Sequence, residues 1–194
     1  MGKGRLEAFS DGVLAIILTI MVLELKVPHG PTFAALFQIW PVFLSYIISF
    51  VYIGIYWNNH HHMLSMVKRV NGGILWANLH LLFWLSLFPF TTDWVADNHF
   101  ASVPMAVYGF VLLMAGLTYW LLQGTIIRDQ GEGSLLRLAV GGDFKGKLSP
   151  LLYFTAIPLA FVHPALAGAL YIFVALMWLV PDPRIEKRLA GRES

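Results

Sequence analysis

The chain has 194 residues, of which 58% are hydrophobic and only 12% are charged, whereas about a quarter of the residues in an ordinary soluble domain are charged. This composition leaves too little polar surface to face water, so it excludes a soluble globular domain and indicates a membrane protein. The formal net charge of +2 gives no reason to expect nucleic-acid binding. Because the chain has no cysteine, neither a disulfide nor a thiolate metal site can form.

The first apolar run predicts a membrane helix over residues 6–26, which is retained because the run lacks a small-residue cleavage site. Twelve uncharged residues, from Gly12 to Leu23, separate Asp11 from Glu24. At 1.5 Å per residue they span about 18 Å of a hydrocarbon core that is about 30 Å thick. Asp11 and Glu24 must therefore lie near or within the bilayer, where charges face protein or water rather than lipid.

One face of this helix is predicted to be largely apolar. At 100° per residue, the residues that share it are Gly12, Ile16, Thr19, Ile20 and Leu23. Ser10 and Asp11 point roughly 120° to 140° away from Ile16, towards neighbouring helices. Ordinary helix packing is the commoner origin of such a stripe, and the pattern alone leaves a functional lining open as the alternative.

Charged residues and prolines divide the rest of the chain into further apolar runs. We expect membrane helices over residues 38–64, 70–93, 100–127, 148–163 and 164–181. The last two come from one run that is too long for a single crossing, and His163-Pro164 at its centre predicts a tight turn. The expected fold is thus a single all-α membrane domain, residues 1–194, with six transmembrane helices.

Basic residues concentrate on one side of these spans. Twelve of the 13 lysines and arginines fall on the side of the N-terminus, and only Lys26 falls on the other. Because lysine and arginine concentrate in cytoplasmic loops, we predict a multi-pass protein of the cell membrane with both termini in the cytoplasm. A short amphipathic segment around Leu135 and Arg137 is expected to lie along the inner leaflet.

The three consecutive histidines His60, His61 and His62 do not predict a metal site, because successive residues on a helix point in different directions. No spacing typical of metal ligands or of a catalytic nucleophile occurs elsewhere, so we expect neither an enzyme nor a cofactor. A secondary transporter of a small cation or proton stays open as an alternative. Such transporters use broken helices at a midplane site, whereas the first helix shows no break.

Three motifs follow one another in the first half of the chain. They are Arg5-Leu-Glu-Ala-Phe9-Ser10-Asp11, then Trp57-Asn-Asn-His60, then Leu75-Trp-Ala-Asn78 leading to Pro89-Phe90. Together they closely resemble the signature of the transmembrane protein 175 family, the endosomal and lysosomal potassium channels and their prokaryotic relatives. The resemblance implies a six-helix subunit that forms a homotetramer in the lipid membrane. It also implies a pore without the Thr-Val-Gly-Tyr-Gly filter of conventional potassium channels, which this sequence lacks as well.

The resemblance further implies roles for individual residues. The first helix of each subunit would line a central pore for monovalent cations, with its narrowest ring at Ile16 and with Thr19, Ile20 and Leu23 towards the outside. A narrow apolar ring can gate by dewetting, and threonine hydroxyls can replace part of the hydration shell of K⁺. We therefore expect a potassium-permeable channel with a modest preference for K⁺ over Na⁺. The other motif residues would form a polar network that braces the pore helix: Arg5, Phe9, Ser10, Asp11, Trp57, His60 and Asn78.

Overall fold

The computed structural model describes residues 2–131, 134–141 and 143–179, and every regular element in these ranges is a helix. The expectation of an all-α fold is therefore confirmed. Within the described ranges, four segments are long and apolar enough to cross a membrane: α1 (Lys3–Leu23), α3 (Trp40–Ser65), Gly72–Asp97 and α6 (Ser102–Gln130). The remaining helices are α2 (Phe33–Gln38), α7 (Leu135–Val140), α8 (Phe144–Val162) and α9 (Pro164–Leu179).

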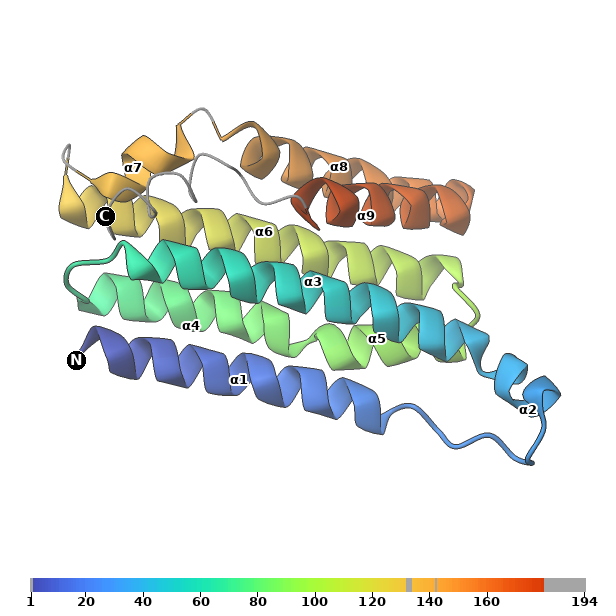
Figure 1. Ribbon diagram of the computed structural model, residues 1–194. Helices are drawn as coiled ribbons and strands as arrows, with labels where there is room; N and C mark the ends of the chain where they lie inside the picture. The colour runs from blue at the N-terminus through green and yellow to red at the C-terminus, as the bar shows by residue number, and fades with distance from the viewer. Residues whose placement is uncertain (1, 132–133, 142, 180–194) are drawn as a thin grey trace.

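The expected helix over residues 70–93 is divided in the structure. Helix α4 (Gly72–Ser86) ends before Leu87, and α5 (Phe88–Asp97) continues in the same direction (Figure 1). The division follows from Pro89, which has no backbone N–H to donate and whose ring crowds the carbonyl of the residue four positions earlier. Hydrogen bonding resumes where the Thr91 N–H donates to the Leu87 carbonyl at 3.1 Å.

Other helix ends depend on side-chain caps that a hydropathy pattern does not reveal. Helix α2 precedes the second long helix because the Thr32 hydroxyl accepts a hydrogen bond from the Ala35 N–H at 3.2 Å. Helix α8 begins earlier than residue 148, because the Asp143 carboxylate accepts from the Gly146 N–H at 3.0 Å. Residues 180 and 181 of the last expected helix lie outside the described ranges.

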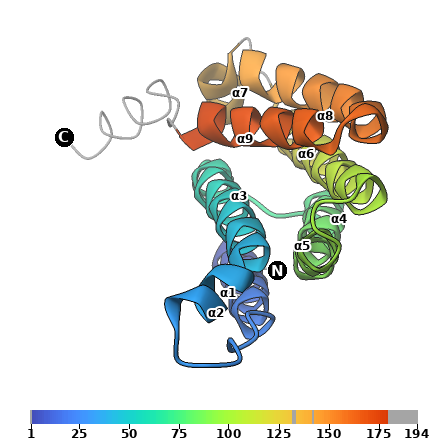
Figure 2. The same ribbon diagram turned by 90° about the vertical axis from the view of Figure 1, so that its right-hand side faces the viewer.

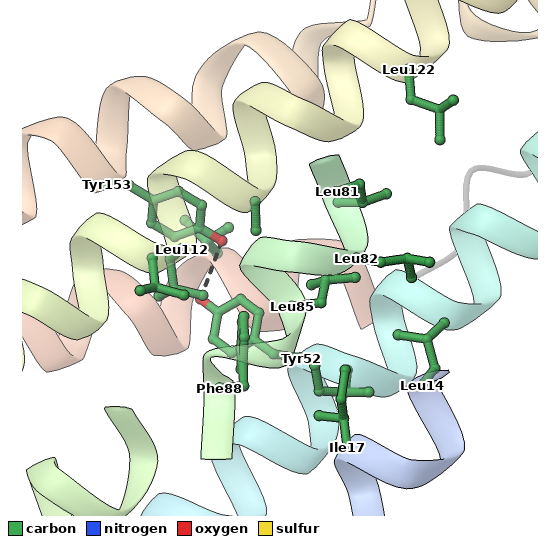
Figure 3. Packing of buried hydrophobic residues seen from close by; sticks show 14 of the residues in the cluster. Leu14, Ile17, Tyr52, Leu81, Leu82, Leu85, Phe88, Leu112, Leu122 and Tyr153 are labelled. Atoms are coloured by element: carbon green, nitrogen blue, oxygen red, sulfur yellow. Dashed lines mark hydrogen bonds between the residues drawn. The ribbon is translucent and has the colours of Figure 1, made fainter. Parts of the chain in front are cut away.

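The long helices run up and down beside one another, and α8 and α9 form a hairpin against α6 and α3 (Figures 1 and 2). Side chains from every long helix meet in one apolar core. In Figure 3, Leu14 of α1, Leu85 of α4 and Leu112 of α6 belong to this core. The hydroxyl of Tyr153 on α8 donates to that of Tyr52 on α3 at 3.3 Å, so the hairpin and the first helices share a buried polar contact.

Polar contacts at each end of the bundle show which helix ends lie together. At the end that carries the N-terminus, the Lys3 ammonium donates to the Ser65 carbonyl at 2.7 Å, and the Asn71 amide donates to the Asp129 carboxylate at 2.6 Å. At the opposite end, Lys26 pairs with Asp97 at 3.8 Å. The beginning of α1, the end of α3, the beginning of α4 and the end of α6 therefore lie together.

Candidate functional site

Helix α1 is packed on one side only. Its buried residues recur at intervals of three or four, which places them on a single face: Leu6, Ser10, Leu14, Ile17 and Met21. This face rests against α3, α4 and α5. These three helices therefore contact α1 from the same side.

The opposite side of α1 is open and largely apolar. Ile16 is 58% exposed, Ile20 is 41% exposed and Leu23 is 78% exposed. A methyl group added at Gly12 would meet no atom within 4 Å. These residues lie on the face that the helical period selects, and the single chain leaves them uncovered.

Thr19 is the polar residue on this open face. Its hydroxyl donates to the Ile16 carbonyl at 2.9 Å, one turn back along the helix. The hydroxyl proton is thereby used within α1, whereas the oxygen keeps lone pairs that can accept a hydrogen bond or coordinate a cation. The exposed side chain therefore presents an oxygen atom on the open face, about one turn from Ile16.

A buried chain of hydrogen bonds joins three of the expected network residues. The Asn78 amide of α4 donates to the Ser10 hydroxyl of α1 at 2.9 Å, and Ser10 in turn donates to the Leu6 carbonyl at 2.8 Å. The amide oxygen of Asn78 lies 2.7 Å from Nε2 of His60 on α3. Because that oxygen can only accept, Nε2 of His60 carries the proton. Asn78 and Ser10 are 0% exposed and His60 is 2% exposed, so the chain ties three helices together away from solvent.

A second link joins α1 to α3 nearer the surface. The indole N–H of Trp57 donates to the Asp11 carboxylate at 3.0 Å, and both side chains are exposed. Arg5 and Phe9 also lie exposed on α1. Among the described residues, no hydrogen bond or ion pair joins Arg5 to the other motif residues. The structure thus brings five of the seven expected network residues into two hydrogen-bonded groups and leaves two at the surface.

Sequence reasoning missed the role of Lys3. Besides its bond to Ser65, the ammonium group lies 3.7 Å from the Glu7 carboxylate. A lysine and a glutamate four residues apart on a helix are a recognisable pairing signal. Lys3 therefore fixes the first turn of α1 to the last turn of α3.

The histidine run does not form a metal centre. His61 stacks on Trp57 with ring centroids 6.2 Å apart, whereas His60 faces Asn78. In the described ranges, no group of three histidine, aspartate or glutamate side chains is placed to hold a metal ion. The polar residues of this region connect helices to one another.

Residues 5–89 match the family model described as endosomal/lysosomal potassium channel TMEM175. A potassium channel of Chryseobacterium sp. is 58% identical over 97% of this chain and 98% of its own length. A potassium channel of Streptomyces collinus is 32% identical over 95% of this chain and 96% of its own length.

The human endosomal/lysosomal proton channel TMEM175 is 37% identical over 81 residues, which cover 36% of this chain and 16% of that protein. A solved crystal structure also matches, that of a lysosomal potassium-selective channel TMEM175 homolog from Chamaesiphon minutus. It has a TM-score of 0.80 and 30% identity, and the match covers 91% of this chain and 96% of the other. The three motifs, the matched segment and the relatives that align over almost their full length agree, and the chain belongs to the TMEM175 potassium channel family.

Proposed function

We propose that this chain forms a potassium-permeable cation channel whose pore is lined by α1 from several subunits. The observation that carries the proposal is the uncovered apolar face of α1, with Ile16 near its middle and Asp11 and Glu24 close to its ends. The twelve uncharged residues between Asp11 and Glu24 span only about 18 Å of a hydrocarbon core about 30 Å thick. A helix with charges at that depth is poorly suited to face lipid, because such groups seek protein or water. Water in an ion pathway would solvate these charged groups.

The relatives support potassium as the permeating ion. The bacterial proteins that align over nearly their full length are named potassium channels, and the matching crystal structure is described as a potassium-selective homolog. The chain contains no Thr-Val-Gly-Tyr-Gly sequence to build stacked carbonyl rings. Selectivity would then depend on side chains such as Thr19, and a single hydroxyl layer should give only a modest preference for K⁺ over Na⁺.

A homotetramer is the proposed assembly. One copy of α1 cannot enclose a pore, so several copies must surround an axis, and closed cyclic symmetry provides this arrangement. In a tetramer, four Ile16 side chains would form an apolar ring that excludes water and thereby blocks ions until it widens. Arg5 and Phe9, which are exposed in the single chain, would meet their partners across the subunit boundary.

The decisive experiment is a reversal-potential measurement. Purified protein in planar bilayers, with potassium on one side and sodium on the other, should show a reversal potential displaced modestly towards the potassium equilibrium potential. A reversal potential that follows a chloride gradient would overturn the cation-channel proposal. An empty bilayer and a bilayer with heat-denatured protein provide the baselines.

The division between α4 and α5 is the feature that would suit a secondary transporter, since transporters bind their substrates at broken helices. Phe88, at this division, is fully buried, and α1 runs from Lys3 to Leu23 without a break. Measurements of ion flux in liposomes distinguish the two functions. Channel flux rises steadily with potassium concentration and needs no second gradient, whereas transporter flux saturates and is coupled.

A further inference from the structure

A cavity of about 390 Å³ lies between α3, α5, α6 and α9, near the end of the bundle that carries α2. A single water molecule needs only about 10–15 Å³ of such volume, so this space is many times larger than a hydration site. Its walls are mainly apolar and aromatic, including Leu44, Val95, Phe100, Met105 and Ile172. A cavity with this lining suits a hydrocarbon group.

Ser45 is the exception in the lining. Its side chain is 5% exposed, and its hydroxyl has no hydrogen-bond partner among the described residues. A serine inside a helix ordinarily donates to a carbonyl three or four residues earlier, as Ser65, Ser86 and Ser149 all do here. A buried hydroxyl without a partner costs about 1–3 kcal/mol, so an acceptor from outside the chain would be bound favourably at Ser45.

Among the described residues, none of the neighbouring hydroxyls bonds to Ser45. Ser49 lies 2.6 Å from the Thr92 hydroxyl and 3.0 Å from the Tyr108 hydroxyl, so these three groups are hydrogen-bonded to one another. The Tyr171 hydroxyl donates to the Met105 carbonyl at 3.0 Å. In the described part of the cavity wall, Ser45 is the buried hydroxyl that lacks a partner.

The cavity opens on the side of the bundle, between α3 and α9. Trp40 and Leu44 of α3 and Ala169 and Ile172 of α9 line it and are also exposed. Tryptophan is typical of the membrane–water interface, and Ser45 follows Trp40 by five residues, or about 8 Å along the helix. The hydroxyl therefore lies just below the interface, at a depth that the carbonyl group of a lipid ester can reach.

We propose that this cavity binds one acyl chain of a membrane lipid, with the Ser45 hydroxyl donating a hydrogen bond to the ester carbonyl of that chain. The apolar walls take up the hydrocarbon, and the carbonyl supplies the acceptor that the protein does not. Such a lipid would connect α3 with α9 in the same way that a buried side chain does. The proposal does not depend on ion conduction and can be tested by binding alone.

The test uses the full chain, purified in detergent, stripped of lipid and then titrated with dioleoylphosphatidylglycerol. Native mass spectrometry counts the lipids that each subunit retains. Ser45→Ala should weaken retention by about twofold to tenfold, which corresponds to one hydrogen bond. The matched control is Ser86→Ala, which removes an exposed hydroxyl outside the cavity and should leave retention unchanged. Equal retention by the wild type and Ser45→Ala would overturn the proposal.

A dialkyl ether analogue of the same lipid tests the carbonyl directly. The wild type should bind the ether lipid as weakly as Ser45→Ala binds the ester lipid, and Ser45→Ala should not distinguish the two. A wild type that binds both lipids equally would overturn the assigned hydrogen bond.

Filling the mouth of the cavity tests the acyl chain. Ala169→Trp should remove one retained lipid per subunit, whereas Leu176→Trp, two turns further along the exposed face of α9, should not. Should Ala169→Trp dissociate the oligomer while lipid retention stays the same, a neighbouring subunit fills the cavity and the proposal is wrong.

Discussion

The Thr19 hydroxyl illustrates how one side chain can serve two purposes on α1. Its proton is donated to the Ile16 carbonyl of the same helix, so the hydroxyl needs no other acceptor. This also holds the oxygen in one orientation on the exposed face. In the proposed pore, an apolar ring at Ile16 would thus lie one turn from a ring of pre-oriented oxygen atoms.

Ile16→Asn is expected to raise the potassium current. A polar side chain at the narrowest ring would keep water in the constriction and lower the cost of moving an ion through it. Single-channel recording in planar bilayers measures the effect as a higher conductance or a higher open probability. Val22→Asn is the matched control, because Val22 is also exposed on α1 but lies about 120° away from Ile16 around the helix. If neither the conductance nor the open probability changes in Ile16→Asn, Ile16 is not the narrow point.

Asn78→Ala is expected to lower the free energy of unfolding by about 1–3 kcal/mol, because it leaves the buried Ser10 and His60 without their shared partner. Thermal or denaturant unfolding of the protein in detergent measures the loss. Asn98→Ala is the control: its amide donates to the Trp94 carbonyl at the surface, and its loss should change stability by less than about 0.5 kcal/mol. Equal effects of the two substitutions would remove the bracing role from Asn78.

Sequence motifs identified the buried chain of Ser10, Asn78 and His60 because a polar residue in a membrane helix requires a partner. They could not reveal that Arg5 stays separate from that chain, because spacing along one helix does not determine which side chains of other helices a residue reaches. Ser45 was missed for a different reason. Nothing in the pattern of α3 distinguishes a serine that bonds to its own helix from one that faces a cavity.

At the scale of helices, α6 and α9 approach closely where a glycine faces a tyrosine. A methyl group added to Gly109 would overlap the hydroxyl group of Tyr171. That hydroxyl also donates to the Met105 carbonyl on α6. The small residue and the hydrogen bond therefore fix the position of α9 on α6 together.

Gly109→Ala should consequently destabilise the protein by about 1–3 kcal/mol through overpacking. Gly124→Ala on the same helix should instead stabilise it by about 0.5–1 kcal/mol, because alanine favours the helix and no atom lies within 4 Å of the new methyl group. Unfolding of both variants in the same detergent makes the comparison. Effects of the same sign would show that contact with Tyr171 does not decide the outcome.

The division of the third long segment shows which features of the helices a sequence reveals. Charges at Arg69 and Asp93 set the outer limits of the expected helix, and Pro89 already lay inside it. Prolines are tolerated within membrane helices when neighbouring groups satisfy the backbone, so Pro89 alone did not decide between a kink and a break. The structure shows a division, with Leu87 between the two helices.

At the scale of the whole molecule, the described basic residues cluster at one end of the bundle. Lys3 is bonded to the last turn of α3, and Lys68 follows directly after that helix. Lys26 lies at the other end, beside Asp97. The four basic residues beyond position 179 that contribute to the predicted sidedness lie outside the described ranges.

Cysteine labelling can test this orientation directly, because the natural chain has no cysteine. In intact cells, a membrane-impermeant maleimide should label Lys26→Cys and should label Lys68→Cys only after the membrane is opened. Both side chains are exposed, so accessibility within the protein is matched. The reverse pattern would place the N-terminus outside the cell.

The attachments of α1 to its neighbours are distributed unevenly along its length. Among the described residues, its side-chain hydrogen bonds to other helices all involve Lys3, Ser10 or Asp11, in the first half of the helix. The second half is held by the apolar packing of Leu14, Ile17 and Met21, which is not directional. A rod clamped at one end pivots about the clamp, so small displacements near Asp11 become large ones at Leu23. Helix α1 thus has the attachments of a lever whose fulcrum lies in its first half.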